Sequence, residues 1–279
     1  MDTLATKAAE WLKQHSASER SFARALKRFF ADQAQRVADA ADGVDLTTGS
    51  VPLIFHAADE HTRMMVVVRR NLAGLMVVGA QAQQRELERR RRARKFIDEE
   101  YRERFDLDVD DVLQLYLEAV PVAMRDAIRR AVDESASQVY WRAVQDGVQA
   151  DIATIIKDGL DAGRNNQQTA KRIAAELGGD LAKRRAKVIA RTETTGARNA
   201  GHQIQLEDAG QSDLVLGKEW LAIGDNDTRQ THLEAHGQKV AKSEPFIVGG
   251  YEAPYPGHWS LPAQERVSCR CTFTAVIAV

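Results

Sequence analysis

The residues best suited to chemistry lie near the C-terminal end of the chain. Its only two cysteines, Cys269 and Cys271, are one residue apart in the sequence RVSCRCTFTAVIAV, and His232 and His236 are four residues apart. On a strand, residues i and i+2 share a face with Cα atoms about 6–7 Å apart, and on a helix residues i and i+4 share a face. Thiolates and imidazoles are preferred zinc ligands, so these four residues form a candidate metal site.

We nevertheless expect these thiols to pack in a protein core and not to bind a metal. Structural zinc sites usually take their cysteines from a tight turn with two to four intervening residues, and a Cys-x-Cys pair on a strand suits tetrahedral geometry less well. A buried cysteine behaves as a small apolar side chain, and a buried His232 would be held by hydrogen bonds. Cysteines this close cannot form an unstrained disulfide, which is typical of a cytosolic protein. The expected protein carries no cofactor and no metal, with zinc binding as the alternative.

An enzymatic function is the second alternative. Asp225 and Asp227 lie close enough to His232 and His236 in the sequence to hold a divalent cation that activates water, as in a metal-dependent hydrolase or nuclease. A nucleophilic pair of either cysteine with His232 is a further alternative. The sequence shows no third group that would orient such a pair and no glycine-rich phosphate loop, so we expect a non-enzymatic protein.

The remaining charged residues of this segment are expected to have structural roles. Asp227 and Arg229 would pair across a turn that starts at Asp225. Arg270, between the two cysteines, would lie on the opposite face of the strand, where a guanidinium can bind a carboxylate through two hydrogen bonds. Such a residue suits an interface with a partner protein.

The elements that must position these residues change in character along the chain. Apolar residues recur at helical spacing through the first two thirds, as at Phe22 and Leu26, and 44% of all residues are hydrophobic. Glycine, proline and aromatic residues gather toward the C-terminal end, and the last residues are β-branched, which is typical of a strand. We predict an α+β protein, with a predominantly helical region over residues 1–157 and a small domain over residues 158–279 in which a few antiparallel strands pack on helices.

Capping residues predict two helix starts. Ser16 and Glu19 have capping-box spacing ahead of an apolar helical face. Asn165 is a candidate N-cap, with Gln168 at the third helical position. The helix that follows, Leu181–Leu206, is expected to support the C-terminal strands.

The strongest charge run lies in the first half of the chain. The formal net charge is −1, so no overall attraction to nucleic acid or membrane is expected. The local run of basic residues is flanked by acidic ones, a pattern typical of a solvated helix with ion pairs one turn apart. The alternative is contact with DNA phosphates or with an acidic protein surface. The residues that would make this contact are Arg89, Arg90, Arg91, Arg92, Arg94 and Lys95.

No segment of the sequence is expected to enter a membrane. The most apolar stretch, residues 64–80, is interrupted by Arg69 and Arg70 and is shorter than the ~20 residues that a transmembrane helix needs. The first residues show no basic region followed by an apolar run. We therefore predict a buried or interface helix over residues 64–80.

Several residues of the C-terminal part occur in an order that resembles a known family. The pattern KEW…DxRxxHxxxxG…F…G…P…CRC and the upstream stretch AKVIARTETTGARNAG resemble the C-terminal domain of the phage Mu F-like head morphogenesis family. The resemblance covers roughly residues 158–277, with Ser268 where the family usually has asparagine. The matching residues are Lys218, Trp220, Asp227, Arg229, His232, Gly237, Phe246, Gly250, Pro256, Cys269, Arg270 and Cys271.

This resemblance implies a minor structural protein of a tailed-phage head, assembled in the host cytoplasm and retained in the virion. Such a protein would associate with the portal vertex and act in procapsid assembly or DNA delivery, without catalytic activity. The implied partners are the portal protein, the major capsid or scaffolding protein, and packaged DNA. Amphipathic helices would provide apolar contacts to these proteins, and Arg-rich faces would meet acidic surfaces or DNA.

Overall fold

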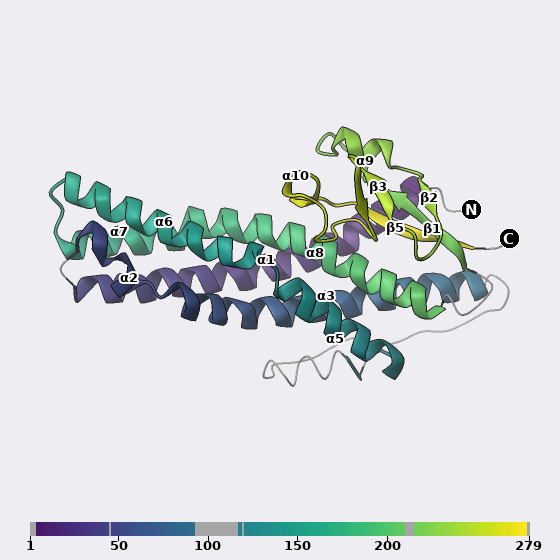
Figure 1. The fold of residues 1–279 in the computed structure, drawn as a ribbon, viewed down its shortest axis with the longest axis horizontal. Helices are drawn as coiled ribbons and strands as arrows, with labels where there is room; N and C mark the ends of the chain where they lie inside the picture. Colours follow the sequence, from purple (N-terminus) through teal and green to yellow (C-terminus); the bar gives the residue numbers. More distant parts are fainter. Residues whose placement is uncertain (1–3, 45, 93–116, 119, 210–214, 278–279) are drawn as a thin grey trace. The chain divides into compact units, whose positions relative to one another are not determined.

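The fold is given by a computed structural model, which describes residues 4–44, 46–92, 117–118, 120–209 and 215–277 (Figure 1). Long helices account for most of this part of the chain. They are α1 (Leu4–Asp42), α3 (Ala57–Arg92), α5 (Val122–Ala136), α6 (Tyr140–Asp161), α7 (Asn166–Gly178) and α8 (Asp180–Ala209). Shorter helical turns are η1 (Thr48–Ser50), α2 (Val51–Ile54), α9 (Gln230–Glu234) and α10 (Ala263–Arg266). With a small antiparallel sheet near the C-terminal end, these helices confirm the predicted α+β class.

The chain divides into two compact units, each assembled from segments that are distant in the sequence. The mixed unit, which contains the strands, is formed within residues 1–18, 70–133 and 191–279. The helical unit consists of residues 19–69 and 134–190. The expected domain boundary after residue 157 falls inside α6 and stays a prediction.

The two capping predictions have different outcomes. Asn165 caps α7, because its side chain accepts the N–H of Gln168 at 2.9 Å while the Gln168 side chain accepts the N–H of Asn165 at 3.0 Å. The helix start at Ser16 is wrong, because α1 begins at Leu4 and continues through this position. The Ser16 hydroxyl instead donates to the Leu12 carbonyl oxygen at 2.8 Å. A serine inside a helix can satisfy its hydroxyl on the preceding turn, so its capping pattern need not begin a helix.

The helical unit has an apolar core with a polar cluster among its buried groups. Phe22, Leu26 and Phe30 of α1 are buried, as their helical spacing predicts. The Gln33 amide donates to the Glu60 carboxylate at 3.0 Å and to the Gln145 side-chain oxygen at 2.8 Å. These bonds join α1, α3 and α6 within one unit, and they satisfy polar groups that burial would otherwise leave without water.

The mixed unit holds a three-stranded antiparallel sheet with β1 at its centre. β1 (Val215–Leu221) pairs with β2 (Lys239–Val240) on one side and with β5 (Thr272–Ile277) on the other. A separate hairpin is formed by β3 (Phe246–Val248) and β4 (Tyr251–Ala253). The Trp220 ring of β1 lies edge-on to the Phe246 ring of β3, with centroids 5.3 Å apart, so aromatic packing joins the sheet to the hairpin.

Helices α3 and α8 meet backbone to backbone inside the mixed unit. A Cβ atom added to Gly201 would lie 1.9 Å from the Met76 carbonyl oxygen, and one added to Gly79 would lie 2.1 Å from the Arg198 carbonyl oxygen. No side chain fits at these distances, so the close approach requires glycine at both positions. The apolar stretch over residues 64–80 lies within α3, and none of the described helices is long and apolar enough to cross a membrane.

His15, His202 and His232 are buried in the mixed unit, and His202 lies among aromatic rings. The His202 ring lies edge-on to Trp11 and to Phe273, at centroid distances of 5.1 and 5.8 Å. Within the described part of the chain, neither ring nitrogen of His202 has a hydrogen-bond partner. Burial lowers the pKa of His202 and that of His15 to about 3, because a charged ring would lose its hydration.

Replacing His202 with phenylalanine should reduce the acid sensitivity of the fold. The unfolded histidine has a pKa near 6.5 and the folded one near 3, so the unfolded chain binds the extra proton between these values. Stability contributed by the neutral ring is therefore present above pH 6.5 and is lost as the pH falls toward 3. We expect His202→Phe to remove about 2 kcal/mol of the loss in unfolding free energy between pH 7 and pH 5, measured by urea denaturation.

The exposed His56, replaced in the same way, is the matched control and should leave the pH dependence unchanged. Identical pH profiles for the unsubstituted chain and His202→Phe would contradict the buried neutral state of this ring.

Candidate functional site

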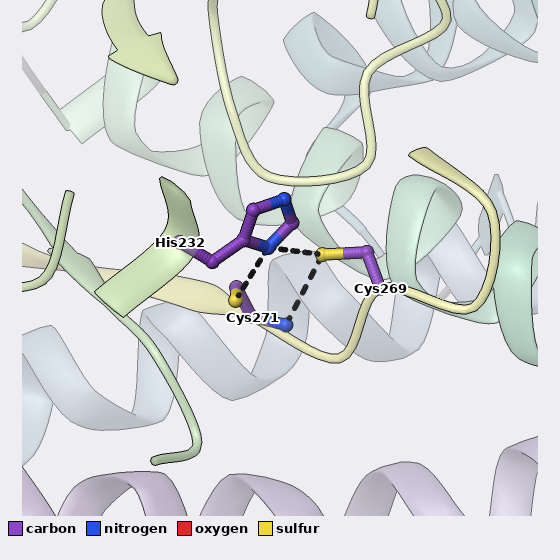
Figure 2. Close-up of side chains that lie close together, drawn as sticks. All are labelled: His232, Cys269 and Cys271. Atoms are coloured by element: carbon purple, nitrogen blue, oxygen red, sulfur yellow. Dashed lines mark hydrogen bonds between the residues drawn. The ribbon is translucent and has the colours of Figure 1, made fainter. Parts of the chain in front are cut away.

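Three of the predicted residues meet in the mixed unit. Figure 2 shows the His232 ring directed at the sulfur atoms of Cys269 and Cys271. Its Nδ1 atom lies 3.3 Å from Cys271 Sγ and 3.6 Å from Cys269 Sγ, and all three side chains are buried. In the part of the chain that the structure describes, this is the group of three metal-ligand atoms that lie within 4.8 Å of one another.

The two thiols converge because of a turn and not because of a strand. β5 begins at Thr272, after both cysteines, so the predicted placement of the Cys-x-Cys pair on a strand is wrong. The backbone at Ser268 has φ of 58°, the left-handed conformation, and the Cys271 N–H donates to Cys269 Sγ at 3.4 Å. This compact arrangement brings both sulfurs to one ring nitrogen.

The other nitrogen of His232 is held by a residue that the sequence did not single out. Glu265 of α10 places its Oε2 atom 3.1 Å from His232 Nε2, and the same oxygen accepts the Thr231 hydroxyl at 2.8 Å. The Glu265 side chain is itself buried. A carboxylate on one imidazole nitrogen fixes the ring orientation and determines what the opposite nitrogen presents to its neighbours.

The cluster favours one negatively charged sulfur. The hydrogen bond from Cys271, together with the His232 ring, lowers the pKa of the Cys269 thiol well below its ordinary value. The same hydrogen bond and burial raise the pKa of Cys271 well above its ordinary value. Burial alone would lower the pKa of His232, but the hydrogen bond and charge of Cys269 outweigh burial and raise it. These opposite pKa shifts give the two thiols different electrostatic environments beside the ring, as at metal-binding and reactive cysteines.

The other predicted ligands do not join this cluster. α9 ends at Glu234, and the His236 Nδ1 atom accepts the backbone N–H of Ala222 at 3.1 Å. Arg270 binds Asp225 through two nitrogens, at 2.6 and 2.7 Å, and its Nη2 lies 3.8 Å from Asp227 Oδ2. The carboxylate partner of Arg270 thus lies in its own chain.

The predicted pairing of Asp227 with Arg229 is also wrong. Arg229 Nη2 instead donates to the Val267 carbonyl oxygen at 2.5 Å, just before the turn that carries the thiols. Backbone carbonyls in a turn need donors when they are not part of a ladder, and a guanidinium within reach supplies one.

Three further motif residues support the fold around the cluster. Lys218 is fully buried, and its Nζ donates to the Pro254 carbonyl oxygen at 2.7 Å and to Gln203 Oε1 at 3.2 Å. Burial lowers the pKa of Lys218 to about 8. Trp220 lies edge-on to His232 at a centroid distance of 5.9 Å, and Gly237, with φ of 80°, donates its N–H to the Trp220 carbonyl oxygen.

A buried polar face of α8 holds the whole C-terminal segment. Asn199 Nδ2 donates to the carbonyl oxygens of Pro256 and Cys271, both at 2.9 Å, and its Oδ1 accepts the Thr272 hydroxyl at 2.8 Å. The Thr195 hydroxyl donates to the Cys269 carbonyl oxygen at 2.5 Å. One turn before Thr195, this face continues with an ion pair and a further hydrogen bond.

That ion pair joins α8 to α10. Arg266 Nη2 donates to both carboxylate oxygens of Glu193, at 2.6 and 2.8 Å, and both residues are buried. Burial raises the pKa of Glu193, and the Arg266 charge opposes this rise. Next to Glu193, Thr192 accepts the backbone N–H of Ser268 at 2.9 Å. The sequence shows the polar residues of RTETTGARNAG, but it does not show their hydrogen-bond partners, which lie more than 50 residues away.

The Arg-rich run is only partly described. Arg89–Arg92 form the C-terminal end of α3, and Arg94 and Lys95 lie outside the described residues. The structure therefore leaves the predicted contacts of this run with DNA or a partner as predictions.

This combination defines a class of protein: an α+β chain whose small antiparallel domain is built on a buried polar helix and a Cys–His cluster. Residues 150–274 match the family described as Phage Mu protein F like protein. The match includes α7, α8, β1, β2, the first half of β5 and all three residues of the cluster. No solved structure matches the chain.

Two curated relatives match part of the chain. The chain is 32% identical over 133 residues to the NAD(+)–arginine ADP-ribosyltransferase EFV of Enterococcus faecalis, which covers 48% of this chain and 27% of that protein. It is 32% identical over 165 residues to Minor head protein GP7 of Bacillus phage SPP1, which covers 57% of this chain and 51% of that protein. The chain therefore spans about half or less of the length of these relatives.

Replacing Ser268 with asparagine should stabilise the mixed unit. Asparagine adopts the left-handed conformation more readily than other non-glycine residues, and Ser268 has φ of 58°. We expect Ser268→Asn to raise the unfolding free energy by roughly 0.5–1 kcal/mol and Ser268→Val, which is β-branched, to lower it by about 1 kcal/mol or more. Urea denaturation of the three chains measures both changes, and equal stability of the asparagine and valine variants would refute backbone strain at this position.

Proposed function

We propose that this chain is a minor structural protein of a tailed-phage head, bound at the portal vertex and present in the virion. The observation that carries this proposal is the Mu F-like match over residues 150–274, and the separate match to a phage minor head protein supports it. The family match supports a structural role in the phage head. The finer proposal is that the chain binds the portal protein and the major capsid or scaffolding protein during procapsid assembly, and that it aids DNA delivery.

The proposed mechanism is binding through apolar side chains that each unit leaves exposed. In the helical unit, Val139 is 78% exposed and Leu53 is 65% exposed. In the mixed unit, Ile247 and Tyr251 of the β3–β4 hairpin are also exposed. Single exposed apolar residues are common, but large ones on ordered elements provide the contacts that a partner protein can bury.

No enzymatic activity is proposed for the chain. The match to the ADP-ribosyltransferase spans 27% of that protein, so the activity in its name refers to a much longer chain. The acidic residues that a hydrolase would need beside the cluster are engaged elsewhere, since Asp225 is paired with Arg270. These observations support a binding role for the C-terminal domain and leave the Cys–His cluster as a structural element.

Association with purified portal rings is the first test. We expect the full chain to co-sediment saturably with portal rings at moderate salt. Val139→Ser and Leu53→Ser together should weaken this association about tenfold or more, because exposed apolar anchors carry much of the energy of an interface. Lys171→Ser, an equally exposed polar position in the same unit, is the matched control and should bind like the unsubstituted chain. A lack of association at every salt concentration would contradict the portal proposal.

DNA contact is tested separately. Replacing Arg89, Arg90, Arg91 and Arg92 with glutamine should weaken binding to duplex DNA about tenfold or more and reduce its salt dependence, because fewer counterions are released. The measurement is a mobility-shift titration at several salt concentrations. The matched control replaces four exposed basic residues of the helical unit, Lys27, Arg28, Arg142 and Lys171, which changes the net charge equally. Equal losses in both variants would show that only net charge matters and would rule out a DNA contact by the Arg-rich run.

A further inference from the structure

We propose that His232, Cys269 and Cys271 form a zinc site. Their Nδ1 and two Sγ atoms lie within 4.8 Å of one another, in a buried part of the mixed unit. Figure 2 shows that the ring nitrogen and both sulfurs face a common point. This proposal reverses the expectation from sequence, which rested on a Cys-x-Cys pair held apart by a strand.

The two sulfur–nitrogen distances fit zinc. Zinc binds cysteine sulfur at about 2.3 Å and histidine nitrogen at about 2.0–2.1 Å, so tetrahedral coordination places sulfur and nitrogen about 3.6 Å apart. The two observed sulfur–nitrogen distances are 3.3 and 3.6 Å. Two thiolates and one imidazole are also a soft donor set, which selects zinc over magnesium or calcium. On binding, any ligand atom that still carries a proton releases it to solvent, and the ion takes the place of that proton.

Glu265 completes the arrangement found around metal-bound histidines. A histidine that ligates through one nitrogen usually donates its other N–H to a carboxylate, which orients the ring. His232 Nε2 meets Glu265 Oε2 at 3.1 Å, and that carboxylate oxygen also accepts the Thr231 hydroxyl.

A small cavity provides the fourth coordination position. A space of about 10 Å³ borders the cluster, and Asp227, Thr228 and Arg229 are among the residues that line it. This is close to the space that one water molecule requires. We assign the fourth ligand to water held there, because no fourth sulfur or imidazole lies with the cluster in the described ranges.

The site would connect segments that secondary structure does not join. His232 lies on α9, whereas the cysteines lie 37 and 39 residues further on, in the turn before β5. A bound ion would hold this turn against α9 and so stabilise the small domain, since a ligand that binds the folded state alone shifts the folding equilibrium.

Metal analysis of the purified full chain tests the proposal. We expect about one zinc per chain after expression in zinc-supplemented medium, and at most about a tenth of that in His232→Ala, Cys269→Ser or Cys271→Ser. His236→Ala removes a neighbouring histidine outside the cluster and is the matched control, which should retain its zinc. Glu265→Gln should retain zinc but lose it to a competing chelator at roughly 10–100-fold lower chelator concentration.

A second measurement does not depend on the folding of a variant. Cobalt added to the unsubstituted, metal-free chain should produce the intense near-ultraviolet absorption of thiolate-to-cobalt charge transfer, and zinc should abolish it. Zinc should also protect both thiols from a thiol reagent and raise the melting temperature by about 5 °C or more. A folded chain that binds neither ion after reconstitution, or zinc that persists in all three ligand variants or is lost in His236→Ala, would overturn the proposal.

Discussion

The buried polar face of α8 is the constraint on which the C-terminal segment depends. The chain from the β3–β4 hairpin to β5 is rich in turns, so many of its carbonyl and N–H groups have no strand partner. Asn199, Thr195 and Thr192 supply those partners from a single helix face, and each is almost completely buried. Because an unpaired buried polar group is costly, this face selects one position for the segment and thereby places both cysteines.

The short helix α10 connects the polar face of α8 to the Cys–His cluster. Its last two residues point to different partners, since Arg266 binds Glu193 of α8 and Glu265 binds His232 of α9. One helical turn therefore ties the orientation of the histidine to the position of the long helix. The cluster is rigidly held for this reason, which suits either a packed core or a bound ion and does not require a catalytic role.

The polar side chains and the exposed apolar side chains of this protein have different roles. The mixed unit devotes its polar groups to internal contacts: even Arg270, expected to serve an interface, binds Asp225 of the same chain. Exposed apolar residues lie on both units, with Val139 and Leu53 on the helical unit and Ile247 and Tyr251 on the mixed unit.

The sequence by itself determined the α+β class, the apolar face of α1 at Phe22 and Leu26, the cap at Asn165 and the Mu F-like motif, because these depend on local spacing or on ordered residue types. Only the tertiary structure decided the rest. Helix α1 continues through Ser16, because packing over a long helix outweighs one local capping pattern. His236 binds the Ala222 N–H and does not join His232. The tertiary structure also brought Glu265 to His232 across 33 residues and placed the two thiols on a turn. Contacts between residues this far apart follow from how α8 satisfies buried polar groups, and no local pattern encodes that pairing.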